Sequence, residues 1–114
     1  MSDNKFSNIE IIDTIRGIAA MQAPESLLGG EDTFALSKII GELDNKTVHI
    51  LAIDVSNVLA INSSGLGILI AANRLLTSKN IQFTLVNPSQ KVQEILSMTH
   101  LDKVFHFAND LSAL

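Results

Sequence analysis

The feature that most constrains this fold is a nearly continuous apolar run from Val48 to Val55. A run of this kind is typical of a central strand in a parallel sheet, where both faces are covered or nearly so. A long apolar segment that ends near Ser78 follows it and predicts a helix, and Ile81 to Val86 predicts a second buried strand. Strands that alternate with helices in this way predict an α/β fold with right-handed crossovers.

The N-terminal part of the chain predicts a hairpin. Apolar and polar residues roughly alternate from Phe6 to Ile15, which is the pattern of a half-buried strand. Arg16-Gly17 predicts a tight turn, and Ile18 to Gln22 predicts the returning antiparallel strand. An irregular segment follows, Pro24 to Gly30, and the pattern does not place it.

Helix signals are clearest where a capping residue precedes an apolar stripe. Asp32 or Thr33 is expected to cap a first helix, which shows one apolar stripe and ends near residue 44. Asn87 is expected to cap a third helix with Pro88 at its first position, where proline needs no N–H partner. A short strand and the stub of a helix are expected at 104–107 and 110–114. The sequence thus predicts one domain, residues 1–114, with a mixed, mostly parallel sheet, an N-terminal antiparallel hairpin and flanking helices.

Composition excludes several classes of function. The 114 residues contain no Cys, so disulfides, thiol nucleophiles and zinc-thiolate sites are excluded. A net charge of −4 with only eight Lys and Arg gives no electrostatic footprint for nucleic acid. The sequence shows no signal peptide, and its most apolar run is about ten residues short of a membrane span. We therefore expect a cytoplasmic protein that does not insert into the membrane.

Motifs for catalysis or metal binding are not found in the sequence. His49, His100 and His106 lie in different predicted elements, without metal-ligand spacing. No dinucleotide fingerprint or Walker lysine is present, and Ser63 lacks the frame of a hydrolase elbow because position 61 is Ile. We expect no enzyme activity, no cofactor and no metal.

The most informative stretch is Ala60 to Leu69, which joins the central strand to the apolar helix. It places Ser63 and Ser64 at a predicted helix N-terminus, whose partial positive charge favours an anion. Asn and Ser are good N-cap residues, so a plain capping role for this pair is a common alternative. Gly65 and Gly67 lack a Cβ atom and so allow another surface to approach the backbone.

These residues carry a resemblance to a known family. The stretch from Ile53 to Gly67 resembles the signature of the STAS domain, typified by bacterial anti-sigma factor antagonists. The similarity continues through Leu85 to Pro88, Val92 to Leu96 and Leu101 to Phe105, and so covers roughly residues 47–107. The first 46 residues match only in outline, because the segment from Pro24 to Gly30 is longer than the usual link from hairpin to helix.

The resemblance implies a binding switch controlled by phosphorylation. In such proteins an anti-sigma factor that is also a serine kinase, of the histidine-kinase-like ATPase type, phosphorylates a Ser that follows an Asp. The unmodified form binds this partner and the phosphorylated form releases it. By position the acceptor is Ser63, with Ser64 as second choice, but Asn62 replaces the usual Asp. The resemblance also implies a partner-binding loop that contains Asp54, Asn62, Ser64, Gly65, Leu66 and Gly67.

Several alternatives stay open at this point. The chain could be a soluble STAS subunit that supports an ABC-type lipid transporter, binds the transporter ATPase and needs no phosphorylation. An enzyme or nucleotide-binding protein is disfavoured by the missing motifs. Asp54 could serve only to fix the loop backbone. Leu66 and Ile68 could be core residues, or one of them could face a partner beside Gly65.

Overall fold

The structure is a computed structural model that describes residues 9–114. Residues 6–8 of the predicted first strand lie outside the described residues. The main sheet has five strands in the order β1-β2-β4-β6-β7, which are β1 (Glu10–Asp13), β2 (Ile18–Gln22), β4 (Ile50–Asp54), β6 (Gln82–Val86) and β7 (His106–Ala108). β1 pairs antiparallel with β2, and all the other neighbours are parallel. The predicted mixed sheet with an N-terminal hairpin is confirmed.

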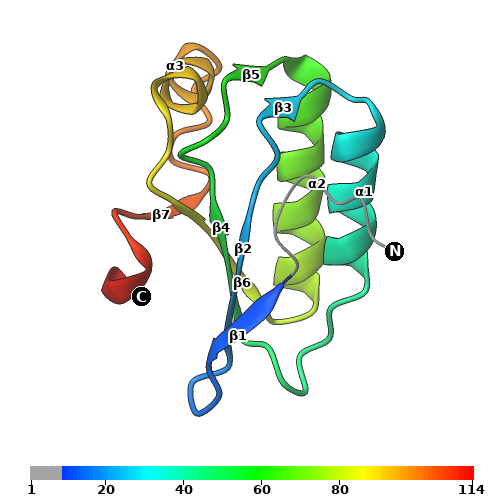
Figure 1. The fold of residues 1–114 in the computed structure, drawn as a ribbon, viewed down its shortest axis with the longest axis vertical. Helices are drawn as coiled ribbons and strands as arrows, with labels where there is room; N and C mark the ends of the chain where they lie inside the picture. Colours follow the sequence, from blue (N-terminus) through cyan, green and yellow to red (C-terminus); the bar gives the residue numbers. More distant parts are fainter. Residues whose placement is uncertain (1–8) are drawn as a thin grey trace.

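The described residues form three α-helices and one short 3₁₀ helix. They are α1 (Glu31–Gly41), α2 (Ser63–Ser78), α3 (Gln90–Met98) and η1 (Leu111–Ala113). In Figure 1, α1 and α2 run side by side along the sheet, whereas α3 lies apart from them at the end of the molecule that also holds β5. None of the helices within residues 9–114 has the length and hydrophobicity needed to cross a lipid bilayer.

The two faces of the main sheet are covered very differently. Alternate residues of the central strands, such as Leu51 and Phe83, are fully buried in a large core with apolar residues of all three α-helices. The opposite face carries small side chains, and the C-terminal residue Leu114 packs there against the cluster Ala20, Ala52 and Val86. The central strands are therefore largely buried on both faces, as their long apolar runs predict, although the α-helices cover only one face.

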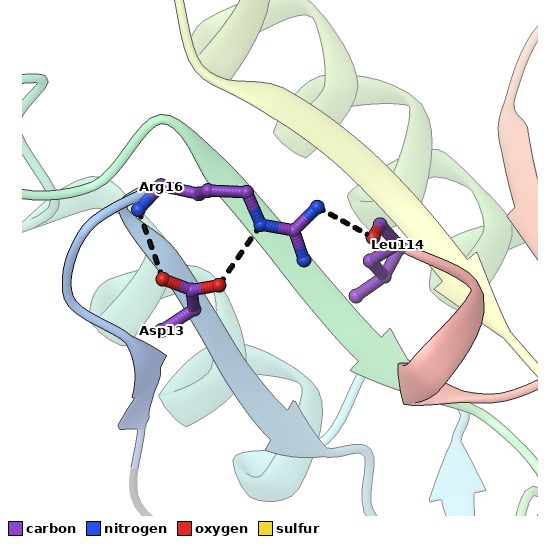
Figure 2. A network of polar contacts seen from close by, with 3 residues as sticks. All are labelled: Asp13, Arg16 and Leu114. Atoms are coloured by element: carbon purple, nitrogen blue, oxygen red, sulfur yellow. Dashed lines mark hydrogen bonds and ion pairs between the residues drawn. The ribbon is translucent and has the colours of Figure 1, made fainter.

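The C-terminal segment is tied to the turn of the hairpin (Figure 2). Arg16 donates hydrogen bonds to both carboxylate oxygens of Asp13, from its backbone N–H and from Nε, each at 2.9 Å. Its Nη1 donates to the main-chain carbonyl oxygen of Leu114 at 2.8 Å. The two hydrogen bonds that Arg16 donates to Asp13 hold the pKa of this partly exposed carboxyl below its usual value.

The hairpin differs in detail from its prediction. β1 contains only Glu10–Asp13, and the turn spans residues 14–17, with Ile15 94% exposed. A bulge between Ile11 and Asp13 shifts the register, which explains why the alternation of apolar and polar residues is imperfect there. Gly17 takes a positive φ of 69°, as a tight turn requires.

Two predicted helix caps are wrong. The N-cap of α1 is Gly30, and Thr33 instead lies buried in the first turn, where its hydroxyl accepts the Gly29 N–H at 3.0 Å. The N-cap of α3 is Ser89, whose hydroxyl accepts the Val92 N–H at 3.3 Å. Pro88 therefore precedes the helix and is not its first residue, so Asp32, Thr33 and Asn87 are not N-caps.

Two further strands are absent from the prediction. β3 (Ser26–Leu27) and β5 (Ala60–Ile61) form a separate two-stranded parallel sheet. Figure 1 shows them side by side at the end of the molecule where α2 begins. The segment from Pro24 to Gly30, which the sequence pattern does not place, is therefore an ordered neighbour of the candidate site.

Candidate functional site

The candidate site is built around the first turn of α2. Ser63 and Ser64 are its first two residues, and both are exposed. The N-cap is Asn62, whose Oδ1 accepts the Gly65 N–H at 3.0 Å. The alternative interpretation of Ser63 as the helix cap is therefore wrong. The first turn, which the structure describes in full, contains no acidic side chain, so nothing within it opposes the partial positive charge of the helix start.

Asn62 also connects α2 to the segment beside it. Its backbone N–H donates to the Leu27 carbonyl oxygen at 3.3 Å, and its Nδ2 donates to the Leu28 carbonyl oxygen at 3.2 Å. Both ends of the carboxamide are thus engaged, since Oδ1 caps the helix while Nδ2 holds a different part of the chain.

The segment from Pro24 to Gly30 forms one wall of the site. The Glu25 carbonyl oxygen accepts the N–H groups of Leu59 and Ala60, at 2.8 and 3.2 Å, which fixes β3 against the start of β5. A Cβ atom built on Gly65 would overlap the Leu27 carbonyl group, at 2.6 Å from its carbon. Only glycine allows β3 and α2 to lie this close, so the close approach that the sequence suggests for Gly65 is confirmed.

The two serines differ in what lies next to them. Gly29 has a positive φ of 91°, and a Cβ atom there would lie 2.9 Å from the Ser64 Cβ and 3.4 Å from its Oγ. The loop after β3 therefore passes directly against Ser64. Within the part of the chain that the structure describes, no glycine packs against Ser63 in this way.

Asp54 ends β4 and fixes the turn that follows. Its Oδ1 accepts the Ser56 N–H at 2.8 Å and the Ser56 hydroxyl at 2.6 Å. Asp54 also lines a small groove of about 380 Å³ together with Val86 and residues of the C-terminal segment. Asp54 therefore fixes the backbone of the loop that follows it. The groove that it lines contains none of Ser63, Ser64 or Asn62.

The remaining predicted site residues divide into buried and exposed ones. Gly65 and Leu66 are buried, Gly67 is exposed and Ile68 is half-buried. Leu66 therefore belongs to the core and does not face outward beside Gly65. The exposed apolar side chains of this region lie outside the predicted stretch, on the flanking segments, and are Leu28, Phe34 and Leu59. The exposure of Phe34 could have been predicted from the sequence, because Phe34 lies off the apolar stripe of the first helix.

The described residues offer no metal site. Among the side chains that the structure describes, no group of three or more His, Asp or Glu residues is arranged so that it could hold an ion. His49, His100 and His106 are all exposed. A groove of about 870 Å³ lies between α3 and the end of β7, and its lining includes Gln93, Asp102 and Phe107 but no residue predicted for the site.

Comparison with known proteins identifies the family. A family model for the STAS domain matches residues 10–114. The chain belongs to the STAS domain family. A Thermotoga maritima protein, named provisionally as an anti-sigma factor antagonist, is 29% identical over 90 residues, which cover 78% of this chain and 80% of the relative.

Solved structures show the same STAS fold. The crystal structure of a Thermotoga maritima protein, also named provisionally as an anti-sigma factor antagonist, superposes with a TM-score of 0.74 at 26% identity, and the match covers 91% of this chain and 86% of that chain. The Bacillus cell-fate determinant SpoIIAA, in its phosphorylated form, has a TM-score of 0.63 at 18% identity, with 95% of each chain covered. Unphosphorylated SpoIIAA, an anti-sigma factor antagonist, has a TM-score of 0.69 at 15% identity, and covers 94% of this chain and 90% of its own. At these identities SpoIIAA supports the fold alone.

Proposed function

We propose that this protein, as a single STAS domain of residues 1–114, is a cytoplasmic, non-catalytic anti-sigma factor antagonist that changes partners through phosphorylation of Ser63. The observation that carries the proposal is the position of the Ser63 hydroxyl. It is exposed at the start of α2, and the helix is capped by the neighbouring Asn62. A kinase can therefore modify Ser63 without removing a cap that the fold needs.

The contacts around the two serines favour Ser63 over Ser64. Gly29 packs against the Ser64 side chain, so the loop after β3 restricts the space for a phosphate on Ser64. A phosphate on Ser63 would extend from an exposed position at the helix N-terminus, where backbone N–H groups and the helix dipole stabilise negative charge.

Phosphorylation would act on partner binding through charge and desolvation. A phosphoserine carries about −1.5 to −2 charges at neutral pH. In a complex the phosphate loses water, and without a matching Arg or Lys on the partner this costs several kcal/mol. Since each 1.4 kcal/mol changes affinity tenfold, we expect a loss of roughly 100-fold to 1,000-fold. The partner proposed is an anti-sigma factor with serine kinase activity.

The test combines mass spectrometry with calorimetry. Protein purified from its own cells is analysed for phosphoserine, and Ser63→Ala is used as bait to capture the partner of the unmodified form. We expect Ser63→Ala to bind like the unmodified protein and to change the free energy of unfolding by less than about 0.5 kcal/mol, because Ser63 is an exposed residue that caps nothing. Ser63→Asp should bind more weakly. The same two changes at Ser64 are the matched controls and should affect binding less.

Two results would contradict the proposal. Equal affinity of Ser63→Ala, Ser63→Asp and the unmodified protein would show that charge at this position does not control binding. Capture of an ABC transporter ATPase in place of a kinase, with no phosphoserine at Ser63, would instead support a transporter-associated STAS subunit.

A further inference from the structure

The side chain of Asn62 makes two bonds that aspartate could not make together. Its Oδ1 accepts the Gly65 N–H at 3.0 Å, and its Nδ2 donates to the Leu28 carbonyl oxygen at 3.2 Å. An ionised carboxylate accepts hydrogen bonds but donates none. Aspartate at position 62 would keep the cap, lose the bond to Leu28 and place a negative charge beside a carbonyl oxygen.

The bond to Leu28 lies where the segment from Pro24 to Gly30 passes the start of α2. On the N-terminal side of Leu28, the segment is held by the pairing of β3 with β5. On the C-terminal side, the Gly29 N–H donates to the Thr33 hydroxyl at 3.0 Å, and Gly29 packs against Ser64. Leu28 itself is 48% exposed. The Asn62 Nδ2 bond adds to these contacts a side-chain bond that ties the Leu28 carbonyl group directly to the cap of α2.

We propose that Asn62 is a positioning residue that fixes the segment from Pro24 to Gly30 to the start of α2. The segment then presents Leu28 next to Ser63, and the two form one surface for the partner. This inference rests on the proposed function, because partner binding is the property that the arrangement serves. The inference also links two departures of this chain from the STAS pattern, which are the Asn at position 62 and the long segment from Pro24 to Gly30, because the Asn side chain bonds to that segment.

The test compares Asn62→Asp with Asn62→Ser by amide hydrogen exchange on the whole free protein. Both variants can still cap α2, so the protection factors of Gly65 and Leu66 should stay close to those of the wild type. Neither replaces the Nδ2 bond, because the ionised carboxylate has no donor and the serine hydroxyl ends one bond nearer the backbone than Nδ2. The protection factor of Gly29 should therefore fall by roughly 5-fold to 10-fold, the size expected for one lost hydrogen bond. A fall confined to Gly29 and its neighbours supports the proposal. Unchanged protection of Gly29 in both variants would overturn it.

The pH profile separates positioning from general loosening. Below about pH 4 the carboxyl group of Asn62→Asp becomes protonated and regains a donor. The Gly29 protection factor of this variant should then rise toward the wild-type value, whereas that of Asn62→Ser should not. Equal pH profiles in the two variants would contradict a specific role of the donor.

Calorimetry then tests the link to binding, with the partner captured by the Ser63→Ala bait as the probe. We expect Asn62→Ser to lower the affinity of the unmodified protein by roughly 5-fold to 20-fold, and Leu28→Ser to do the same without changing the Gly29 protection factor. Lost protection with unchanged affinity would overturn the part of the inference that concerns the partner surface. If no partner is captured, the proposed function fails, and the exchange experiment still decides whether Asn62 positions the segment.

Discussion

Replacing Gly65 with alanine gives the sharpest test of how β3 lies against α2. A Cβ atom at this position would overlap the Leu27 carbonyl group and lie 2.8 Å from the Leu27 Cβ, so β3 or α2 must move. Gly67 lies two residues further along the same helix, and a Cβ atom there would meet nothing within 4 Å. The pair separates the effect of helix propensity from the effect of close packing.

The expected magnitude follows from opposing contributions. Alanine favours a helix over glycine by about 0.8 to 1 kcal/mol. Overpacking a buried contact costs about 1 to 3 kcal/mol. Moving β3 also weakens the two bonds from Asn62 to the carbonyl oxygens of Leu27 and Leu28, each worth about 1 kcal/mol. We therefore expect Gly65→Ala to destabilise the fold by about 2 to 4 kcal/mol, and Gly67→Ala to stabilise it by about 0.5 to 1 kcal/mol.

Urea unfolding followed by far-UV circular dichroism measures both effects, since the chain has no Trp or Tyr for fluorescence. For an m-value near 2 kcal/mol/M, the midpoint of Gly65→Ala should fall by about 1 to 2 M. The reasoning would be refuted if Gly65→Ala stabilised the protein as much as Gly67→Ala does, because β3 would then not touch the helix.

The remaining predictions concern the cap of α3 and the hairpin turn. Ser89→Ala removes the cap of α3 and the 2.7 Å bond from its hydroxyl to the Val58 carbonyl oxygen, so it should lower the free energy of unfolding in urea by about 1 to 3 kcal/mol. Ser97 is exposed on the same helix, and Ser97→Ala should change this free energy little. The Asp13 pKa is lowered in the folded state, chiefly by hydrogen bonds from Arg16, so its contribution to stability is complete above the unfolded pKa of about 3.9 and is lost as pH falls through the folded value. Asp13→Asn should therefore lose less stability than the wild type in acid melts below pH 4, and an identical acid profile would contradict the assignment.

The central part of the fold could be predicted because its signals are local and strong. The apolar run from Val48 to Val55 contains β4, the apolar run from Ile81 to Val86 contains β6, and the apolar segment that begins at Ser63 is α2. Each of these elements buries several large side chains, so the tertiary structure reinforces the local pattern. The position of Ser63 at a helix start follows from the same signals.

The wall of the site could not be predicted because its signal is not local. β3 and β5 have two residues each, too few for a period, and they pair across 34 residues of sequence. They are held by the hydrogen bonds from Leu59 and Ala60 to the Glu25 carbonyl oxygen and by the close packing of Leu27 on Gly65, which the sequence shows only as a glycine in a helix. The wrong cap for α3 has a related cause. Asn87 takes a φ of 50°, which is not the extended backbone of an N-cap, and Ser89 caps the helix instead. Ser89 is held there by bonds to the carbonyl oxygens of Val55 and Val58, which are distant in sequence.

A neutral Asn62 also determines how much the charge at the start of α2 would change if Ser63 were phosphorylated. Where an Asp directly precedes the acceptor, the unmodified loop already carries one negative charge, and phosphorylation adds to it. Here the first turn of α2 contains no acidic residue and its cap is neutral, so phosphorylation would take the helix start from no charge to about −2. The helix dipole can stabilise this phosphate without a neighbouring carboxylate to repel it, which favours an intact fold in the modified state. A partner would then distinguish a neutral surface from a charged one, and a single charge, as in Ser63→Asp, should produce only part of the loss in affinity that phosphate produces.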